Sequence, residues 1–299
     1  MTSVGQGSFR LFRVAGIDVF LHWSWFLVAV FEIQQRAKNY SSLGWNVAEY
    51  LTLFGIVLLH EFGHVLACRQ VGGEADRIVL WPLGGVAVVA PPQRPGAMLW
   101  SIAAGPLVNV LLAPVLLALG FLMGTLGLTE AWPNAHALLQ SIATINVVML
   151  VFNLLPVYPL DGGQILRSLL WFPFGRARSL IAATVIGFLG VAALALSALA
   201  LRSVWLGVLA VFILLNCWQG MRHALILARV ARMPRHAGFA CPDCGSAPQI
   251  GSYWQCSQCR TPFDTFETRS VCPHCGTAFE VTRCLDCGKA HPMREWASQ

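Results

Sequence analysis

The sequence predicts an all-α polytopic membrane protein with about six transmembrane helices, a small membrane-level β-hairpin and a C-terminal double zinc ribbon. Of its 299 residues, 56% are hydrophobic and only 11% are charged, whereas about a quarter of an ordinary soluble domain is charged. Eight of the ten cysteines form four C-x-x-C pairs after residue 240. We therefore expect a membrane domain at 1–230, a short basic linker at 231–240 and a soluble domain at 241–291.

Six apolar segments are long enough, or nearly so, to cross a hydrocarbon core that requires about 20 helical residues. They lie at residues 16–33, 45–68, 96–123, 135–155, 180–201 and 204–227. No small-residue cleavage pattern follows the first segment, so we expect it to stay as a membrane anchor. It contains His22 beside Trp23 and Trp25, and the aromatic neighbours favour an interfacial anchor over a gate for an active site.

The distribution of positive charge predicts the orientation of these segments. If the N-terminus is cytoplasmic, the outside loops hold only Arg36, Lys38 and Arg202. The inside regions then hold Arg10, Arg13, Arg69, Arg77, Arg94, Arg167, Arg176, Arg178, Arg222, Arg229, Arg232 and Arg235. This positive-inside bias places both termini in the cytoplasm. The net charge of +6 is thereby explained as an orientation signal and does not indicate nucleic acid.

Residues 77–90 (RIVLWPLGGVAVVA) connect the second and third segments. They are rich in Val, Ile, Leu and Trp, which favour strands, and are interrupted by Pro82 and the pair Gly84 and Gly85. A loop resting on the membrane is the alternative. We expect two short strands around a glycine turn, at membrane level.

The second segment contains the motif H-E-x-x-H, formed by His60, Glu61 and His64. Residues four apart share one face of a helix, so both imidazoles can bind one zinc ion. Glu61 is then the candidate general base beside the metal. A catalytic zinc needs a third protein ligand and one open position for water.

Asp161 is the strongest candidate for the third ligand. It is the only acidic residue between Glu130 and Asp243, and it follows the fourth apolar segment in the run NLLPVYPLDGG. The alternative role is to cap the next helix. By the charge bias, the motif at residues 60–64 and Asp161 both lie towards the cytoplasmic side, where water enters most easily.

These motifs resemble those of the site-2 protease family of intramembrane zinc metalloproteases. The resemblance rests on HEFGH, on GPLVN at residues 105–109 and on NLLPVYPLDGG at residues 153–163, in that order. It implies a catalytic core at about 45–163, with His60, His64 and Asp161 as zinc ligands and Glu61 as catalytic base. Many bacterial six-helix members carry nucleotide-sensing repeats at the C-terminus, whereas this chain carries cysteine pairs.

The expected mechanism is hydrolysis of a peptide bond in or near a transmembrane segment. An amide of Asn153 or Asn109 is a candidate donor to the oxyanion, although a hydrogen bond between helices is an equally good role for each. We assign the supporting role to Asn153. A helical substrate must unwind before it is cut, and the edge of the hairpin at 77–90 offers it backbone partners.

The cysteine pairs predict two structural zinc sites of four thiolates each. Grouping neighbouring pairs predicts one site from Cys241, Cys244, Cys256 and Cys259 and a second from Cys272, Cys275, Cys284 and Cys287. A reducing cytoplasm disfavours disulfides. Because acidic residues offset the basic ones in this domain, we expect a cytoplasmic protein partner and not nucleic acid.

We therefore expect a zinc-dependent intramembrane endopeptidase with one catalytic and two structural zinc ions. Its substrates are expected to be transmembrane proteins, and its location a bacterial cell membrane in contact with lipid. One alternative is a non-enzymatic membrane scaffold whose ribbons bind a protein or nucleic acid. A second is a metal transporter, which would not need a glutamate next to the first histidine.

Overall fold

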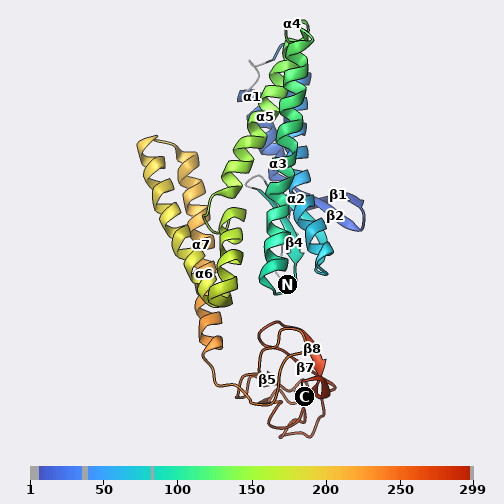
Figure 1. Ribbon diagram of the computed structural model, residues 1–299, viewed down its shortest axis with the longest axis vertical. Coiled ribbons are helices and arrows are strands. Elements are labelled where there is room, and N and C mark those ends of the chain that lie inside the picture. The colour runs from blue at the N-terminus through green and yellow to red at the C-terminus, as the bar shows by residue number, and fades with distance from the viewer. Residues whose placement is uncertain (1–6, 36–39, 82–83, 297–299) are drawn as a thin grey trace. The chain divides into compact units, whose positions relative to one another are not determined.

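The computed structural model describes residues 7–35, 40–81 and 84–296 of the chain. The chain forms two compact units, Met1–Met221 and Arg222–Gln299. Figure 1 shows the path of the chain through them. The helices are α1 Ser24–Gln35, α2 Leu43–Gln70, α3 Pro95–Thr125, α4 Leu128–Ala131, α5 Pro133–Leu154, α6 Asp161–Ala200 and α7 Val204–Ala231.

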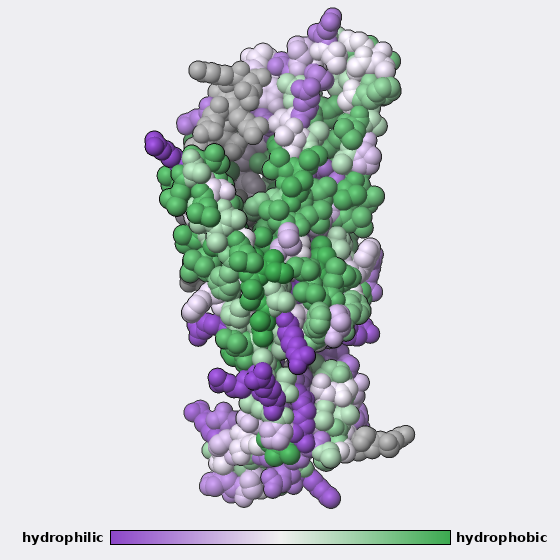
Figure 2. Space-filling view, turned by 60° about the vertical axis from the view of Figure 1, so that its left-hand side comes forward, coloured by the Kyte–Doolittle hydropathy of each residue, from purple (hydrophilic) through white to green (hydrophobic). Residues whose placement is uncertain are grey.

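Among the described residues, five helices are long and apolar enough to cross a membrane: α2, α3, α5, α6 and α7. Large hydrophobic side chains such as Phe121, Leu189 and Leu199 remain exposed on them. On the face drawn in Figure 2, hydrophobic side chains form a broad continuous area. Such a surface is suited to lipid and not to water. The mainly helical membrane fold is confirmed, and the five helices correspond to the last five predicted segments.

The prediction of a transmembrane helix at residues 16–33 is wrong. Strand β2 occupies Ile17–His22, and α1 that follows it has 12 residues, or about 18 Å at 1.5 Å per residue. The reason is an alternating pattern hidden in an apolar run. Ile17, Val19 and Leu21 are buried, whereas Asp18 lies on the other face of the strand, 3.4 Å from Arg10.

The predicted hairpin is confirmed and belongs to a larger sheet. Strands β3 Glu74–Trp81 and β4 Gly84–Ala90 pair antiparallel, β2 pairs parallel with β3, and β1 Ser8–Val14 pairs antiparallel with β2. In the described part of the chain the order is β1-β2-β3-β4, so β1 and β4 are the two edges.

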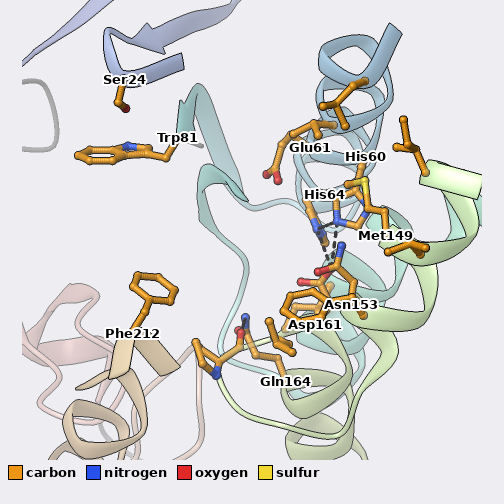
Figure 3. Close-up of a pocket in the computed structure, with 18 of the residues that line it drawn as sticks. Ser24, His60, Glu61, His64, Trp81, Met149, Asn153, Asp161, Gln164 and Phe212 are labelled. Atoms are coloured by element: carbon orange, nitrogen blue, oxygen red, sulfur yellow. Dashed lines mark hydrogen bonds and ion pairs between the residues drawn. The ribbon is translucent and has the colours of Figure 1, made fainter. Parts of the chain in front are cut away.

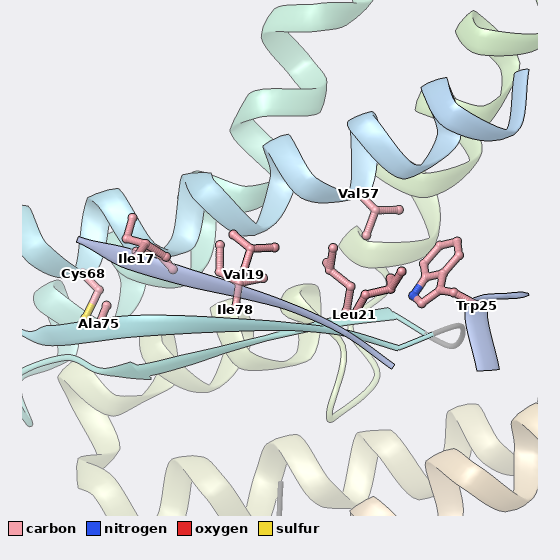
Figure 4. Close-up of a cluster of buried hydrophobic side chains, with 10 residues drawn as sticks. Ile17, Val19, Leu21, Trp25, Val57, Cys68, Ala75 and Ile78 are labelled. Carbon is pink, nitrogen blue, oxygen red and sulfur yellow. The ribbon is translucent and has the colours of Figure 1, made fainter. Parts of the chain in front are cut away.

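The inner face of this sheet packs along α2. Ile17, Val19 and Leu21 of β2 join Ile78 and Leu80 of β3 in one buried cluster with Val57, Val65 and Cys68 of α2. Figure 4 shows the sheet lying along that helix, with Trp25 at the far end of the cluster. Because side chains alternate along a strand, this packing fixes the register of the sheet. The sheet is thereby held beside the helix that carries the H-E-x-x-H motif.

Helix α6 is bent at Gly175, whose backbone angles (φ 77°, ψ 171°) are not helical. Pro173 precedes the bend and cannot donate a backbone hydrogen bond. Figure 1 shows the second half of α6 turned back beside the first. The second half and α7 pack together through Val191, Ile213 and Cys217. The first half of α6 begins with Asp161, and the second half corresponds to the membrane segment predicted at residues 180–201.

The second unit contains four turns built alike, one at each C-x-x-C pair of the described residues. In each turn the N–H four residues after the first cysteine donates to the carbonyl of that cysteine, at 2.8 to 2.9 Å. The residues that donate have positive φ, and they are Gly245, Arg260, Gly276 and Gly288. Two short hairpins, β5 Trp254–Gln255 with β6 Pro262–Phe263 and β7 Val281–Arg283 with β8 Ala290–Pro292, support these turns.

Residues on both sides of the predicted soluble domain at 241–291 contact it. Arg235 of the expected linker forms an ion pair with Asp286 at 2.8 Å, and Ala240 donates to the carbonyl of Trp296. The Trp296 side chain is fully buried with Phe266. The change in composition indicated where the polar region begins. Residues before and after that region complete the small hydrophobic core around Phe266.

Candidate active site

Three of the predicted ligands meet in the first unit. His60 and His64 lie one turn apart on α2, and Asp161 is the first residue of α6. Their ligand atoms are 3.1 Å apart between the two Nε2 atoms, 3.0 Å from His60 Nε2 to Asp161 Oδ2 and 3.4 Å from His64 Nε2 to Asp161 Oδ2. Tetrahedral zinc with ligands at about 2.05 Å requires separations of about 3.3 Å, so these residues fit a zinc ion.

The carboxylate of Asp161 is engaged by the histidines and not by its own helix. Leu160 is the N-cap residue of α6, and the structure shows no side-chain capping bond there. Gly162 and Gly163 follow, and a Cβ atom on Gly163 would lie 2.5 Å from the Val157 carbonyl carbon. Glycine at these positions therefore allows the helix start to pack tightly against the preceding loop. This packing brings Asp161 to the face of α2.

The other nitrogen of each histidine has a buried acceptor. His60 Nδ1 lies 2.7 Å from Asn109 Oδ1, and His64 Nδ1 lies 2.9 Å from the carbonyl of Ser101. With Nδ1–H donating in both rings, each Nε2 is free to bind metal. Asn109 in turn donates to Asn146 Oδ1 at 2.8 Å, and Asn146 donates back to the Asn109 carbonyl at 3.0 Å.

Asn109 is therefore poorly placed to donate to an oxyanion, the role considered for it as an alternative to Asn153. Its side chain is 0% exposed, and its oxygen and nitrogen both serve the histidine network. Asn146 was missed by the sequence reasoning. The available signal was an asparagine in an otherwise apolar helix, which favours a buried polar contact between helices.

Glycines from neighbouring helices make room for the histidines. A Cβ atom on Gly105 would collide with His64 Nε2 and lie 2.9 Å from His60 Nε2. A Cβ atom on Gly63 would lie 2.6 Å from the carbonyl of Ala104. The first glycine of the GPLVN motif thus leaves space for the ligands, and Gly63 lets α2 and α3 approach each other closely.

Glu61 and Asn153 face the same cavity as the histidines. The cavity has a volume of about 1380 Å³ and extends along α2 from Asn46 to His64. In Figure 3 the Glu61 carboxylate points into it beside His60 and His64, and Asn153 lies next to Asp161. Glu61 is 5% exposed. A carboxylate, an amide and a three-ligand metal site therefore border one space.

The hairpin forms another wall of this cavity. Trp81 at the end of β3 and Val89 of β4 line it. His22 stacks on Trp81 with ring centroids 4.1 Å apart and planes inclined by 13°. His22 is thus buried against the sheet, and its role as an interfacial anchor stays a prediction. The edge strand β4 therefore borders the same cavity as His60, Glu61 and His64.

The structure corrects the predicted grouping of the cysteines. The ligand atoms of one cluster belong to Cys241, Cys244, Cys284 and Cys287, and those of the other to Cys256, Cys259, Cys272 and Cys275. The outer two pairs therefore meet each other, and so do the inner two. The spacer lengths do not specify which pairs meet. The bond between Ala240 and Trp296 shows that the two ends of the domain come together.

The sulfur separations in both clusters fit zinc. Sγ atoms lie 3.7 Å apart in Cys241 and Cys287 and 3.6 Å apart in Cys256 and Cys275. Four thiolates at about 2.3 Å from a tetrahedral zinc are about 3.8 Å apart, whereas a disulfide requires about 2.05 Å. Hydrogen bonds from the side chain and backbone of Thr261 lower the pKa of Cys259 to about 5.

Together, His60, His64 and Asp161 form a group that could hold a metal ion, on helices that are apolar and long enough to cross a membrane. The comparison with known families agrees. Peptidase family M50 matches residues 48–135 and 125–197, which is half of the chain. The chain belongs to this family, which includes the site-2 proteases.

The chain is also similar to individual proteins that are named as zinc metalloproteases or putative ones. The chain is 34% identical over 180 residues to a zinc metalloprotease of Methanocaldococcus jannaschii, covering 60% of this chain and 50% of that protein. It is 31% identical over 174 residues to Rip3 of Mycobacterium tuberculosis, covering 53% and 42%. The chain thus spans about half the length of these relatives or less.

A solved structure supports the fold over a larger part of the molecule. The site-2 protease from Methanocaldococcus jannaschii superposes with a TM-score of 0.54 and 29% sequence identity, covering 72% of this chain and 95% of that one.

Proposed function

We propose that this protein is a zinc-dependent intramembrane endopeptidase that hydrolyses peptide bonds in or near transmembrane segments of membrane proteins. The observation that carries the proposal is the convergence of His60, His64 and Asp161 to within zinc-binding distance, with Glu61 facing the same cavity. Membership of peptidase family M50 supports it.

The residues of the site suggest how the reaction proceeds. Zinc held by His60, His64 and Asp161 would polarise the scissile carbonyl and lower the pKa of a water molecule. The Glu61 carboxylate accepts a proton from the attacking water and passes it to the nitrogen of the leaving amine. The Asn153 amide donates a hydrogen bond to the oxygen that gains negative charge, since Asn109 is occupied by His60.

The cavity walls suggest how a substrate is held. A substrate helix satisfies its own backbone groups, so its peptide bonds become accessible only after local unwinding. The free edge of β4 offers N–H and C=O groups to an extended segment. The mainly apolar groove along α2 provides room for the rest of a transmembrane substrate. Addition of the substrate as a strand on β4 would offset the hydrogen bonds lost on unwinding.

We place the protein in a bacterial cell membrane, and the positive-inside bias supports an orientation with both termini in the cytoplasm. We propose that strand β2 and helix α1 together cross the membrane in place of the first predicted helix. With the five longer helices this makes six crossings, which an orientation with both termini on one side requires. The cysteine clusters are proposed as two structural zinc sites of a domain that binds a cytoplasmic protein.

The proposal is tested with purified full-length protein reconstituted in vesicles with a membrane protein substrate. Zinc-loaded wild-type protein is expected to cleave the substrate, and Glu61→Gln is expected to lose about 10⁴-fold in rate or more while it still binds zinc, because the variant keeps shape but removes the base. A scaffold would cleave in neither form. A metal transporter would accumulate zinc in the vesicles without producing fragments.

A further inference from the structure

The bend of α6 brings two arginines onto one tryptophan ring. Trp171 lies one turn after Arg167 and shortly before the bend at Gly175, and Arg176 follows the bend. The guanidinium carbon of each arginine lies 5.9 Å from the centre of the Trp171 ring. The two positive charges are close enough to act on each other. Like charges held together in this way favour a bound anion.

Arg167 lacks a counter-ion among the residues that the structure describes. It is only 9% exposed, and its Nε atom is shielded from solvent without a hydrogen-bond acceptor. The nearest acidic residue along the helix, Asp161, is engaged by the two histidines. A buried guanidinium without a partner is costly in a membrane protein. The site is therefore incomplete within the described part of the chain.

The surroundings of the bend match the chemistry of a phospholipid. Leu169, Phe172 and Phe174 on the same half of α6 are exposed large hydrophobic residues, which suit contact with acyl chains. Tryptophan and arginine are typical of the region where acyl chains meet headgroups. In the proposed orientation this bend lies on the cytoplasmic side, where anionic lipids concentrate.

We propose that Arg167 and Arg176, on either side of the bend in α6, bind the phosphate group of an anionic phospholipid, with Trp171 as the platform between them. A phospholipid headgroup and free inorganic phosphate would both offer a phosphate group to the two arginines. We assign the site to lipid because the hydrophobic residues beside the arginines have no role in binding a free anion. The inference does not depend on proteolytic activity.

The test measures which lipids stay bound to the full-length protein. The protein is extracted in mild detergent from vesicles of equal phosphatidylglycerol and phosphatidylcholine, and the retained lipids are quantified by mass spectrometry. Wild-type protein is expected to retain more phosphatidylglycerol. Arg167→Gln and Arg176→Gln are each expected to lower the ratio of the two lipids about fivefold, as the loss of one interfacial positive charge predicts.

Arg178→Gln serves as the matched control, because Arg178 is an exposed arginine close to the same bend. Its ratio is expected to remain at the wild-type value. Arg167→Lys keeps the charge and is expected to restore most of the preference, which separates anion binding from a folding defect. Equal retention of both lipids by wild-type protein, or an equal loss in Arg178→Gln, would overturn the proposal. Displacement of phosphatidylglycerol by millimolar inorganic phosphate would assign the site to a free anion instead and would also overturn it.

Discussion

Asn109 is predicted to control the zinc affinity of the catalytic site without touching the metal. Its Oδ1 atom lies 2.7 Å from His60 Nδ1, and its side chain is completely buried. Partners of this kind orient a histidine ligand, and their removal costs about 10- to 100-fold in metal affinity. We therefore expect Asn109→Ala to weaken zinc binding at this site by about 1.4 to 2.8 kcal/mol, at 1.4 kcal/mol for each tenfold change.

A second variant separates this effect from the packing of the helices. Asn109→Asp keeps an oxygen that accepts from His60 but loses the N–H groups that serve Asn146 Oδ1. It is expected to retain zinc affinity and to lower the free energy of unfolding by about 1 to 3 kcal/mol, the cost of a buried polar group left without a partner. Asn134→Ala is the matched control. Asn134 lies at the other end of α5 from Asn146 and donates a hydrogen bond to Ser41, away from the histidines.

The assay is competition between the protein and a chelator, followed with cobalt in place of zinc. Cobalt bound by four thiolates absorbs in the near ultraviolet, whereas cobalt bound by two imidazoles and a carboxylate does not, so the catalytic site is distinguished from the cysteine clusters. An unchanged cobalt affinity in Asn109→Ala, with the cysteine clusters unaffected, would refute the argument that Asn109 orients His60.

Two further predictions concern the cysteine clusters and the sheet edge. The double variant Cys241→Ser/Cys284→Ser is expected to lose one zinc ion per chain, because both residues belong to one cluster, whereas Cys241→Ser/Cys256→Ser is expected to lose two zinc ions, because its residues belong to different clusters. Atomic absorption measures the zinc content of both variants. Loss of two zinc ions by the first variant and one by the second would restore the grouping of neighbouring pairs. Val88→Pro and Val89→Pro each remove one backbone N–H from β4. Because N–H groups alternate in direction along a strand, only one of the two points to the free edge. The variant that removes this N–H is expected to slow cleavage at least tenfold without unfolding the protein. Phe12→Pro in β1, the opposite edge, is the control and is expected to leave cleavage unchanged; equal rates in all three variants would exclude strand addition at β4.

The parts of this molecule that could be predicted from the sequence are those in which local spacing carries the chemistry. His60 and His64 are four residues apart, and on a helix that distance alone places them on one face. Asp161 was identifiable because it stands alone among apolar residues after two prolines. The long apolar runs from residue 45 onward predicted the five membrane-capable helices of the described chain.

The missed features depend on contacts between distant segments. Ile17, Val19 and Leu21 alternate with Asp18 and Phe20, but a longer apolar run follows them, so the whole segment resembled a membrane helix until the pairing of β2 with β3 was known. Asn146 acquires its role only through Asn109, 37 residues away. The four cysteine turns are locally alike, and local likeness cannot specify which turns meet.

The most direct test of the central claim is the position and origin of the new chain ends. Zinc-loaded wild-type protein is incubated with a membrane protein substrate in vesicles made in ¹⁸O-labelled water, and the fragments are analysed by mass spectrometry. We predict a new C-terminal carboxylate within or next to the transmembrane segment that carries ¹⁸O, and none with Glu61→Gln. Fragments of the same kind from Glu61→Gln, or cuts confined to soluble regions of the substrate, would contradict the account.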